Sequence, residues 1–114
     1  MAQQTKYEVI AIENFKKELK RVAKKYPTIL ENLAVLITAL EQNPSVGTSL
    51  GSGFFKIRLA IAAKGKGKSG GARVITNIKV VNRKIYLVSI YDKSTQETIT
   101  AKELTFLLQQ IPKL

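Results

Sequence analysis

The sequence predicts an α+β fold in a single domain spanning residues 1–114. Apolar residues recur with the 3.6-residue period of helices before residue 44 and with the two-residue period of strands after residue 54. A capping-box pattern near residue 100 predicts a closing helix. The expected order is therefore a short N-terminal strand, a two-helix hairpin, a three-stranded antiparallel meander and a C-terminal helix. A chain of this length supports one hydrophobic core.

The first half of the chain supplies the short strand and the two helices. Residues 7–12 are rich in β-branched side chains and predict a strand. Two apolar stripes with helical spacing follow, and they consist of Phe15, Leu19, Val22 and Tyr26, then Ile29, Leu33, Leu36 and Leu40. Pro27 suits the start of the second helix, and Pro44 ends it. The two helices are expected to form a hairpin.

The second half supplies the meander and the last helix. Residues 54–63 alternate between apolar and polar side chains, as in a half-buried strand. A polar, glycine-rich loop at 64–71 separates it from two further strands, at 72–81 and 84–91. Thr100 and Glu103 have the spacing of a capping box, so the closing helix begins there.

Strand parity predicts which side chains share a face of the sheet. In the last strand, Tyr86, Val88 and Ile90 are expected to face the helices. The opposite, open face then carries Lys56, Arg58, Arg73, Tyr91 and Lys93. A bulge in any strand would reverse this assignment beyond the bulge.

Composition limits the chemistry that the chain can perform. It has no Cys and no His, which excludes disulfides, thiol nucleophiles and the usual zinc ligands. We expect no metal and no small-molecule cofactor. Catalysis, if present, relies on Lys, Arg, Tyr or carboxylates. No apolar stretch is long enough to span a membrane and no secretory signal precedes the domain, so a cytoplasmic protein without a membrane partner is expected.

Positive charge is concentrated in one segment. The formal net charge is +11, and residues 54–84 contain no acid. Their nine cations are Lys56, Arg58, Lys64, Lys66, Lys68, Arg73, Lys79, Arg83 and Lys84. Each cation alone could equally belong to a solvated sheet face that protects strand edges. As a set they indicate a polyanionic partner, because their mutual repulsion needs an offset, and nucleic acid is the leading candidate.

The glycine-rich loop suits contact with phosphates but not a nucleotide-triphosphate site. Gly67, Lys68 and Ser69 match the end of a P-loop, yet Ala62 stands where the first glycine is required, and a strand follows. Loop lysines between glycines can still contact a phosphate backbone. Tyr91 is the aromatic residue best placed to stack on an unpaired base, although a packing role in the core is equally compatible with the sequence.

Three segments together resemble the RelE/ParE superfamily of bacterial type II toxins, and most closely its RelE and HigB-like ribonuclease branch. They are FKIRL at 55–59, GKGKSGGARVI at 65–75 and IYLVSIYDKS at 85–94. The likeness covers about residues 7–110 and includes the predicted order of elements. It implies a ribosome-dependent endoribonuclease that cleaves translated mRNA and is neutralised by a cognate antitoxin.

The resemblance also implies roles for individual residues. Arg73 would hold the scissile phosphate, Lys93 would stabilise or protonate the leaving group, and Tyr91 would stack on or orient a base. The residues expected to bind RNA are Arg58, Lys56, Lys64, Lys66 and Lys68. Reaction would proceed without metal, through attack of a ribose 2′-hydroxyl on the adjacent phosphate. A ParE-like inhibitor of DNA gyrase, or a non-catalytic RNA-binding domain of the same fold, remains an alternative.

The loop lysines yield a first testable expectation. Replacing Lys64, Lys66 and Lys68 together by Ala should flatten the dependence of RNA affinity on salt, because each lost contact to single-stranded phosphate removes about 0.7 from the slope of log K against log salt. Fluorescence anisotropy over a salt series measures this slope. An affinity of the unaltered protein that does not change with salt would contradict an RNA partner.

Overall fold

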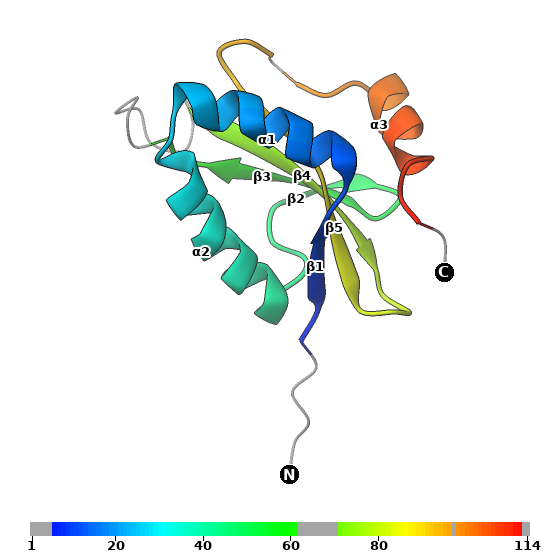
Figure 1. The fold of residues 1–114 in the computed structure, drawn as a ribbon. Coiled ribbons are helices and arrows are strands. Elements are labelled where there is room, and N and C mark those ends of the chain that lie inside the picture. The colour runs from blue at the N-terminus through cyan, green and yellow to red at the C-terminus, as the bar shows by residue number, and fades with distance from the viewer. Residues whose placement is uncertain (1–5, 62–70, 97, 113–114) are drawn as a thin grey trace.

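The computed structural model of the protein describes residues 6–61, 71–96 and 98–112, and it confirms the α+β fold (Figure 1). The elements are β1 (Glu8–Ala11), α1 (Glu13–Lys25), α2 (Ile29–Gln42), β2 (Thr48–Gly51), β3 (Phe54–Leu59), β4 (Ala72–Lys79), β5 (Lys84–Asp92) and α3 (Ala101–Leu108). They form one five-stranded sheet in the order β1-β5-β4-β3-β2. β1 runs parallel to β5, and the other pairings are antiparallel, so the predicted meander is its centre.

Strand β2 was not predicted, and it extends the sheet on the far side of β3. Its four residues carry no clear apolar alternation, so its only sequence signal is the spacing of glycines around it. Gly47 has a φ of 103°, and a Cβ there would stand 2.5 Å from the Lys56 carbonyl oxygen. The close approach of β2 to β3 therefore requires glycine at this position.

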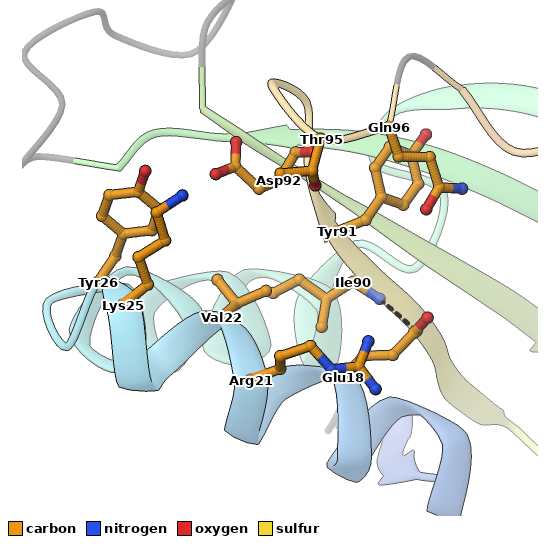
Figure 2. A pocket seen from close by; sticks show the side chains of 10 residues that line it. All are labelled: Glu18, Arg21, Val22, Lys25, Tyr26, Ile90, Tyr91, Asp92, Thr95 and Gln96. Atoms are coloured by element: carbon orange, nitrogen blue, oxygen red, sulfur yellow. Dashed lines mark hydrogen bonds between the residues drawn. The ribbon is translucent and has the colours of Figure 1, made fainter.

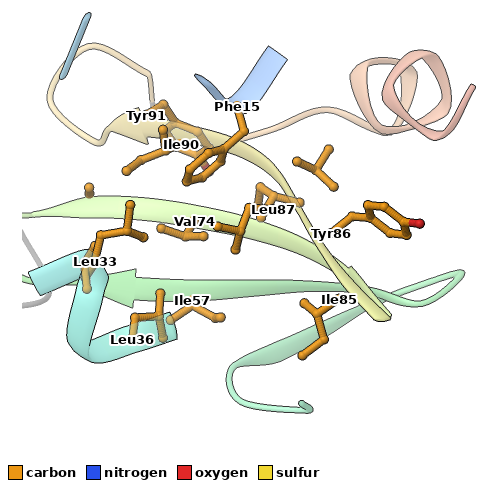
Figure 3. Close-up of a cluster of buried hydrophobic side chains, with 14 of the residues drawn as sticks. Phe15, Leu33, Leu36, Ile57, Val74, Ile85, Tyr86, Leu87, Ile90 and Tyr91 are labelled. Atoms are coloured by element: carbon orange, nitrogen blue, oxygen red, sulfur yellow. The ribbon is translucent and has the colours of Figure 1, made fainter. Parts of the chain in front are cut away.

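Helices α1 and α2 cover one face of the sheet. The register places Ile57, Val74 and Ile90 side by side on that face. Figure 3 shows Phe15 of α1 directed at β5, and Leu33 and Leu36 of α2 beside Ile57. The predicted apolar stripes thus form the core contacts of both helices.

Helix α3 begins where the sequence predicts it. The Thr100 hydroxyl accepts a hydrogen bond from the Glu103 backbone N–H at 3.1 Å, and the Glu103 carboxylate accepts one from the Thr100 N–H at 2.9 Å. This reciprocal capping box satisfies two donors at the helix start. Within the described residues, no helix combines the length and the apolar character needed to cross a membrane.

A β-bulge in β5 changes the predicted assignment of faces. Ile75 pairs with Ser89, but Thr76 pairs with Leu87, which leaves Val88 as the extra residue. Tyr86 therefore lies opposite Asn77 on the face away from α1 and α2. The expectation that Tyr86, Val88 and Ile90 all face these helices was wrong, because the bulge reverses the alternation between them.

The face expected to be open is also largely buried. Along β4, Arg73, Ile75 and Asn77 are between 0% and 4% exposed. The segment that follows β5 contributes to this side, since Ser89 lines a cavity together with Ile99 and Leu107. The sheet is thus packed on both faces, and solvent reaches the predicted polar face mainly at its margins.

Side chains of α1 complete the edge of β5 where β1 ends. β1 pairs with β5 only as far as Leu87. Beyond it, the Asn14 side-chain amide donates to the Val88 carbonyl at 3.0 Å. The Glu18 carboxylate accepts from the Ile90 N–H at 3.2 Å and from the Ser89 hydroxyl at 2.7 Å. Two side chains therefore continue the hydrogen bonding that a longer strand would provide.

Replacing Glu18 by Ala should lower the free energy of unfolding by about 1–3 kcal/mol, because it leaves the Ile90 N–H and the Ser89 hydroxyl without their acceptor. Urea denaturation measures the loss. The matched control is Glu13→Ala on the same helix, which removes only an exposed ion pair with Lys16 and should change stability by about 0.5 kcal/mol or less. Equal losses in both variants would contradict the role of Glu18 at the strand edge.

Candidate functional site

The strand register brings three of the predicted site residues into one row across the sheet. Arg58 of β3 is the cross-strand partner of Arg73 of β4, and Arg73 is the partner of Tyr91 of β5. Cross-strand partners have Cβ atoms about 4.5–5.5 Å apart and point to the same face. Two guanidinium groups and a phenol therefore lie together on the face away from α1 and α2.

Burial differs along this row. Arg73 is 4% exposed, and its Nη1 donates a hydrogen bond to the Ala72 carbonyl oxygen at 3.1 Å. Arg58, next to it, is exposed to solvent. Like charges directly opposite each other on neighbouring strands repel, and a bound anion would relieve that repulsion. The row is consequently suited to an anion that approaches from the Arg58 side.

Among the three residues of the row, Tyr91 has a pKa that is clearly shifted from its usual value. Burial raises the pKa of its phenol above the usual 10.0, and Glu103 of α3 adds to the rise, while Arg73 and the nearby Thr98 side chain oppose it. The Tyr91 hydroxyl is buried and makes no hydrogen bond of regular geometry. Tyr91 therefore keeps its proton at neutral pH.

Lys93 lies just beyond Tyr91, at the start of a tight turn. Its backbone N–H donates to the Gly71 carbonyl at 3.1 Å, which ties the end of β5 to the beginning of β4. Asp92 shapes the turn: its Oδ1 accepts from the Ser94 N–H at 3.0 Å, and its carbonyl accepts from the Thr95 hydroxyl at 3.0 Å. The half-buried Lys93 is thus held beside the Arg73 row by backbone contacts.

The remaining predicted RNA-binding residues are divided between the sheet and the glycine-rich loop. Lys56 shares the face of Arg58 and is half-buried opposite Ile75. Lys64, Lys66 and Lys68 lie outside the described residues. In the part of the chain that the structure describes, no cluster of His, Cys, Asp or Glu is arranged to hold a metal ion. The described site therefore offers a ligand the positive charges of its arginine and lysine side chains.

Sequence inspection missed Glu18, which touches the same stretch of β5. Its carboxylate is bonded to Ser89 and Ile90, directly before Tyr91. The available signal was its place on α1 three residues after Phe15, among the apolar positions of the stripe rather than on the lysine-rich face. An acid on the buried side of an amphipathic helix indicates a polar partner inside the fold.

The raised pKa of Tyr91 predicts a titration above pH 10. The tyrosinate absorbance of Tyr91 should develop above pH 10. Spectrophotometric titration measures it as the difference between the unaltered protein and Tyr91→Phe. Because the folded-state pKa is raised, the stabilisation from the protonated phenol is complete below pH 10 and is lost as pH rises through the folded-state pKa. Tyr91→Phe should therefore lose less stability in alkali. A difference spectrum that develops below pH 10 would contradict the buried, protonated state.

Comparison with known proteins agrees with the fold and the resemblance. Residues 14–113 match the family described as the RelE toxin of the RelE / RelB toxin-antitoxin system. The structure is similar to that of E. coli toxin RelE, solved as a double arginine-to-alanine mutant in the free state, with a TM-score of 0.61 and 16% sequence identity. The superposition covers 94% of this chain and 99% of that one. Because the family match spans most of the sequence, the chain belongs to the RelE toxin family.

Proposed function

We propose that this chain is the toxin of a toxin-antitoxin pair and that it cleaves translated mRNA on the ribosome. The family match supports the toxin role, and a cognate antitoxin is the expected protein partner. Translating ribosomes place the proposed activity in the cytoplasm. The observation that carries the cleavage proposal is the row of Arg58, Arg73 and Tyr91 across three strands.

Phosphodiester cleavage by this row needs only the chain, the RNA and water. The ribose 2′-oxygen bonds to the adjacent phosphorus, and the bond from phosphorus to the 5′-oxygen of the next nucleotide breaks. The products are a 2′,3′-cyclic phosphate and a 5′-hydroxyl: the 2′-hydroxyl proton passes to water, and the 5′-oxygen takes a proton from Lys93 or from water. Negative charge grows on the phosphate oxygens in the transition state, and fixed cations stabilise it there.

Each predicted residue has a distinct role in this proposal. Arg73 is permanently charged and holds the phosphate. Lys93 stabilises the 5′-oxygen as it leaves, or protonates it. Tyr91 is the cross-strand partner of Arg73, and its buried phenol orients the substrate through that arginine. Tyr91 is only 4% exposed, so this indirect orienting role replaces the stacking role that the resemblance also allowed.

RNA contacts outside the row follow from the charge of the neighbouring segments. Lys56 and Arg58 lie on β3 beside Arg73 and extend positive charge toward the solvent-exposed margin of the sheet. Lys64, Lys66 and Lys68 follow β3 in sequence and are proposed as contacts to the phosphate backbone. This concentration of cations without acids favours a nucleic acid over a protein such as gyrase as the target.

Replacing Arg73 by Gln tests the proposal directly. Mapping of mRNA 5′ ends after expression should show that cleavage falls by roughly 10²–10³-fold, the usual cost of removing one preorganised group that stabilises transition-state charge. Arg83→Gln is the matched control, because it removes an exposed cation at the β4–β5 turn and should leave cleavage unchanged. Thermal unfolding of both variants verifies that they fold.

Two outcomes would contradict specific parts of the proposal. Unchanged cleavage by Arg73→Gln would show that Arg73 does not hold the scissile phosphate. Intact transcripts together with broken DNA, on expression of the unaltered protein, would replace mRNA cleavage with a gyrase-directed activity.

A further inference from the structure

A cavity of about 290 Å³ lies on the other side of β5 from the Arg73 row, between α1 and the turn that follows the strand. Figure 2 shows α1 along one wall, with Arg21 and Lys25 on it, and Asp92, Thr95 and Gln96 along the other. The volume is at the lower end of the range for small-molecule sites, which begins at roughly 300 Å³. It accommodates one ring-sized group rather than several.

The inner surface of this cavity is partly apolar, and the Glu18 carboxylate, which accepts hydrogen bonds from Ser89 and Ile90, also lines it. Val22 of α1 and Ile90 of β5 line it, and Ile90 is only 1% exposed. The half-buried Tyr26 adds an aromatic ring at the end of α1. A flat ring can pack on the apolar part of this surface and displace water from it.

The rim on the α1 side is cationic. Arg21 and Lys25 are one helical turn apart and both are exposed. Lys25 Nζ lies 5.4 Å from the centroid of the Tyr26 ring, which keeps the ammonium group close to the cavity. Within the described residues, neither Arg21 nor Lys25 forms an ion pair. Both charges are consequently available to an anionic group at the cavity mouth.

The opposite wall can recognise the edge of a ring. Gln96 donates its side-chain N–H to the Thr98 carbonyl at 3.0 Å, which fixes the amide and leaves its oxygen as an acceptor. The Asp92 carboxylate lies on the same wall and repels anions. An anionic ligand would therefore place its negative group against α1 and its ring toward the turn.

We propose that this cavity binds one nucleotide of the RNA substrate, with the base on Val22 and Ile90 and its phosphate against Arg21 and Lys25. The inference rests on the proposed function and deepens it. Tyr91 lines the cavity and is also part of the Arg73 row. β5 stands between this cavity and Arg73, so a nucleotide bound here anchors a neighbouring part of the RNA strand and not the linkage that is cut.

Charge removal at the rim tests the phosphate contact. The probe is a short RNA with 2′-O-methyl groups throughout, which cannot be cleaved by 2′-hydroxyl attack. Arg21→Gln/Lys25→Gln should flatten the slope of log K against log salt by about 0.7, the contribution of the one phosphate that both cations contact. The matched control, Lys17→Gln/Lys24→Gln, removes the same charge from exposed positions of α1 outside the cavity and should flatten it much less. Equal slopes for the two variants would overturn the phosphate contact.

Removal of single bases tests the ring contact. Abasic substitution at successive positions of the same RNA should weaken binding at one position by about 5–100-fold, the usual range for one stacked base. Val22→Phe fills the cavity and should abolish that penalty, with thermal unfolding as the check on folding. A penalty at no position, or one that Val22→Phe leaves intact, would overturn the base contact.

These measurements separate the cavity from the proposed cleavage. Binding is measured on isolated protein with an uncleavable RNA, so it does not depend on the ribosome or on turnover. A protein that passes both binding tests but leaves cellular mRNA intact would contradict the proposed function and not the nucleotide site. Cleavage of mRNA together with failure of both binding tests would overturn the nucleotide site and not the function.

Discussion

The carboxylate of Glu18 and the amide of Asn14 hold together the part of the fold on which both candidate sites depend. β1 stops pairing with β5 at Leu87, yet β5 continues to Asp92. The two side chains form hydrogen bonds with the backbone of Val88 and Ile90 at the exposed edge of β5. α1 therefore takes the place that a longer β1 would occupy there. The contacts of these two side chains fix α1 relative to the end of β5, and both elements line the cavity.

The centre of the sheet imposes a second constraint, because it places Arg58 directly beside Arg73. Arg73 is almost fully buried, so its guanidinium has little freedom to move away from the exposed Arg58. Such an arrangement costs stability in the free protein unless negative charge offsets it. The same rigidity benefits an electrostatic site, since charges fixed in advance stabilise a transition state without reorganising.

Much of this fold could be predicted because its helices and central strands follow simple periodicities. The stripe from Phe15 and the capping box at Thr100 are local patterns with direct structural meaning. The bulge at Val88 and strand β2 escaped prediction because both depend on pairing with distant residues. For the candidate site, strand parity predicted that Arg73 and Tyr91 share a face, and the register confirms this, while their roles stay a prediction. The rim of the cavity depends on the placement of α1 against β5, which no local pattern predicts.

Because the sequence contains no His, the protonation states of Tyr91 and its neighbours determine which mechanism is available. Burial keeps this phenol protonated, so near neutral pH it does not accept the 2′-hydroxyl proton. Arg73 likewise supplies charge and not proton transfer. Most of the acceleration must then come from charge stabilisation and from alignment of the 2′-oxygen with phosphorus. A ribosome that holds the mRNA strand would supply that alignment, which is why the proposed reaction belongs on the ribosome.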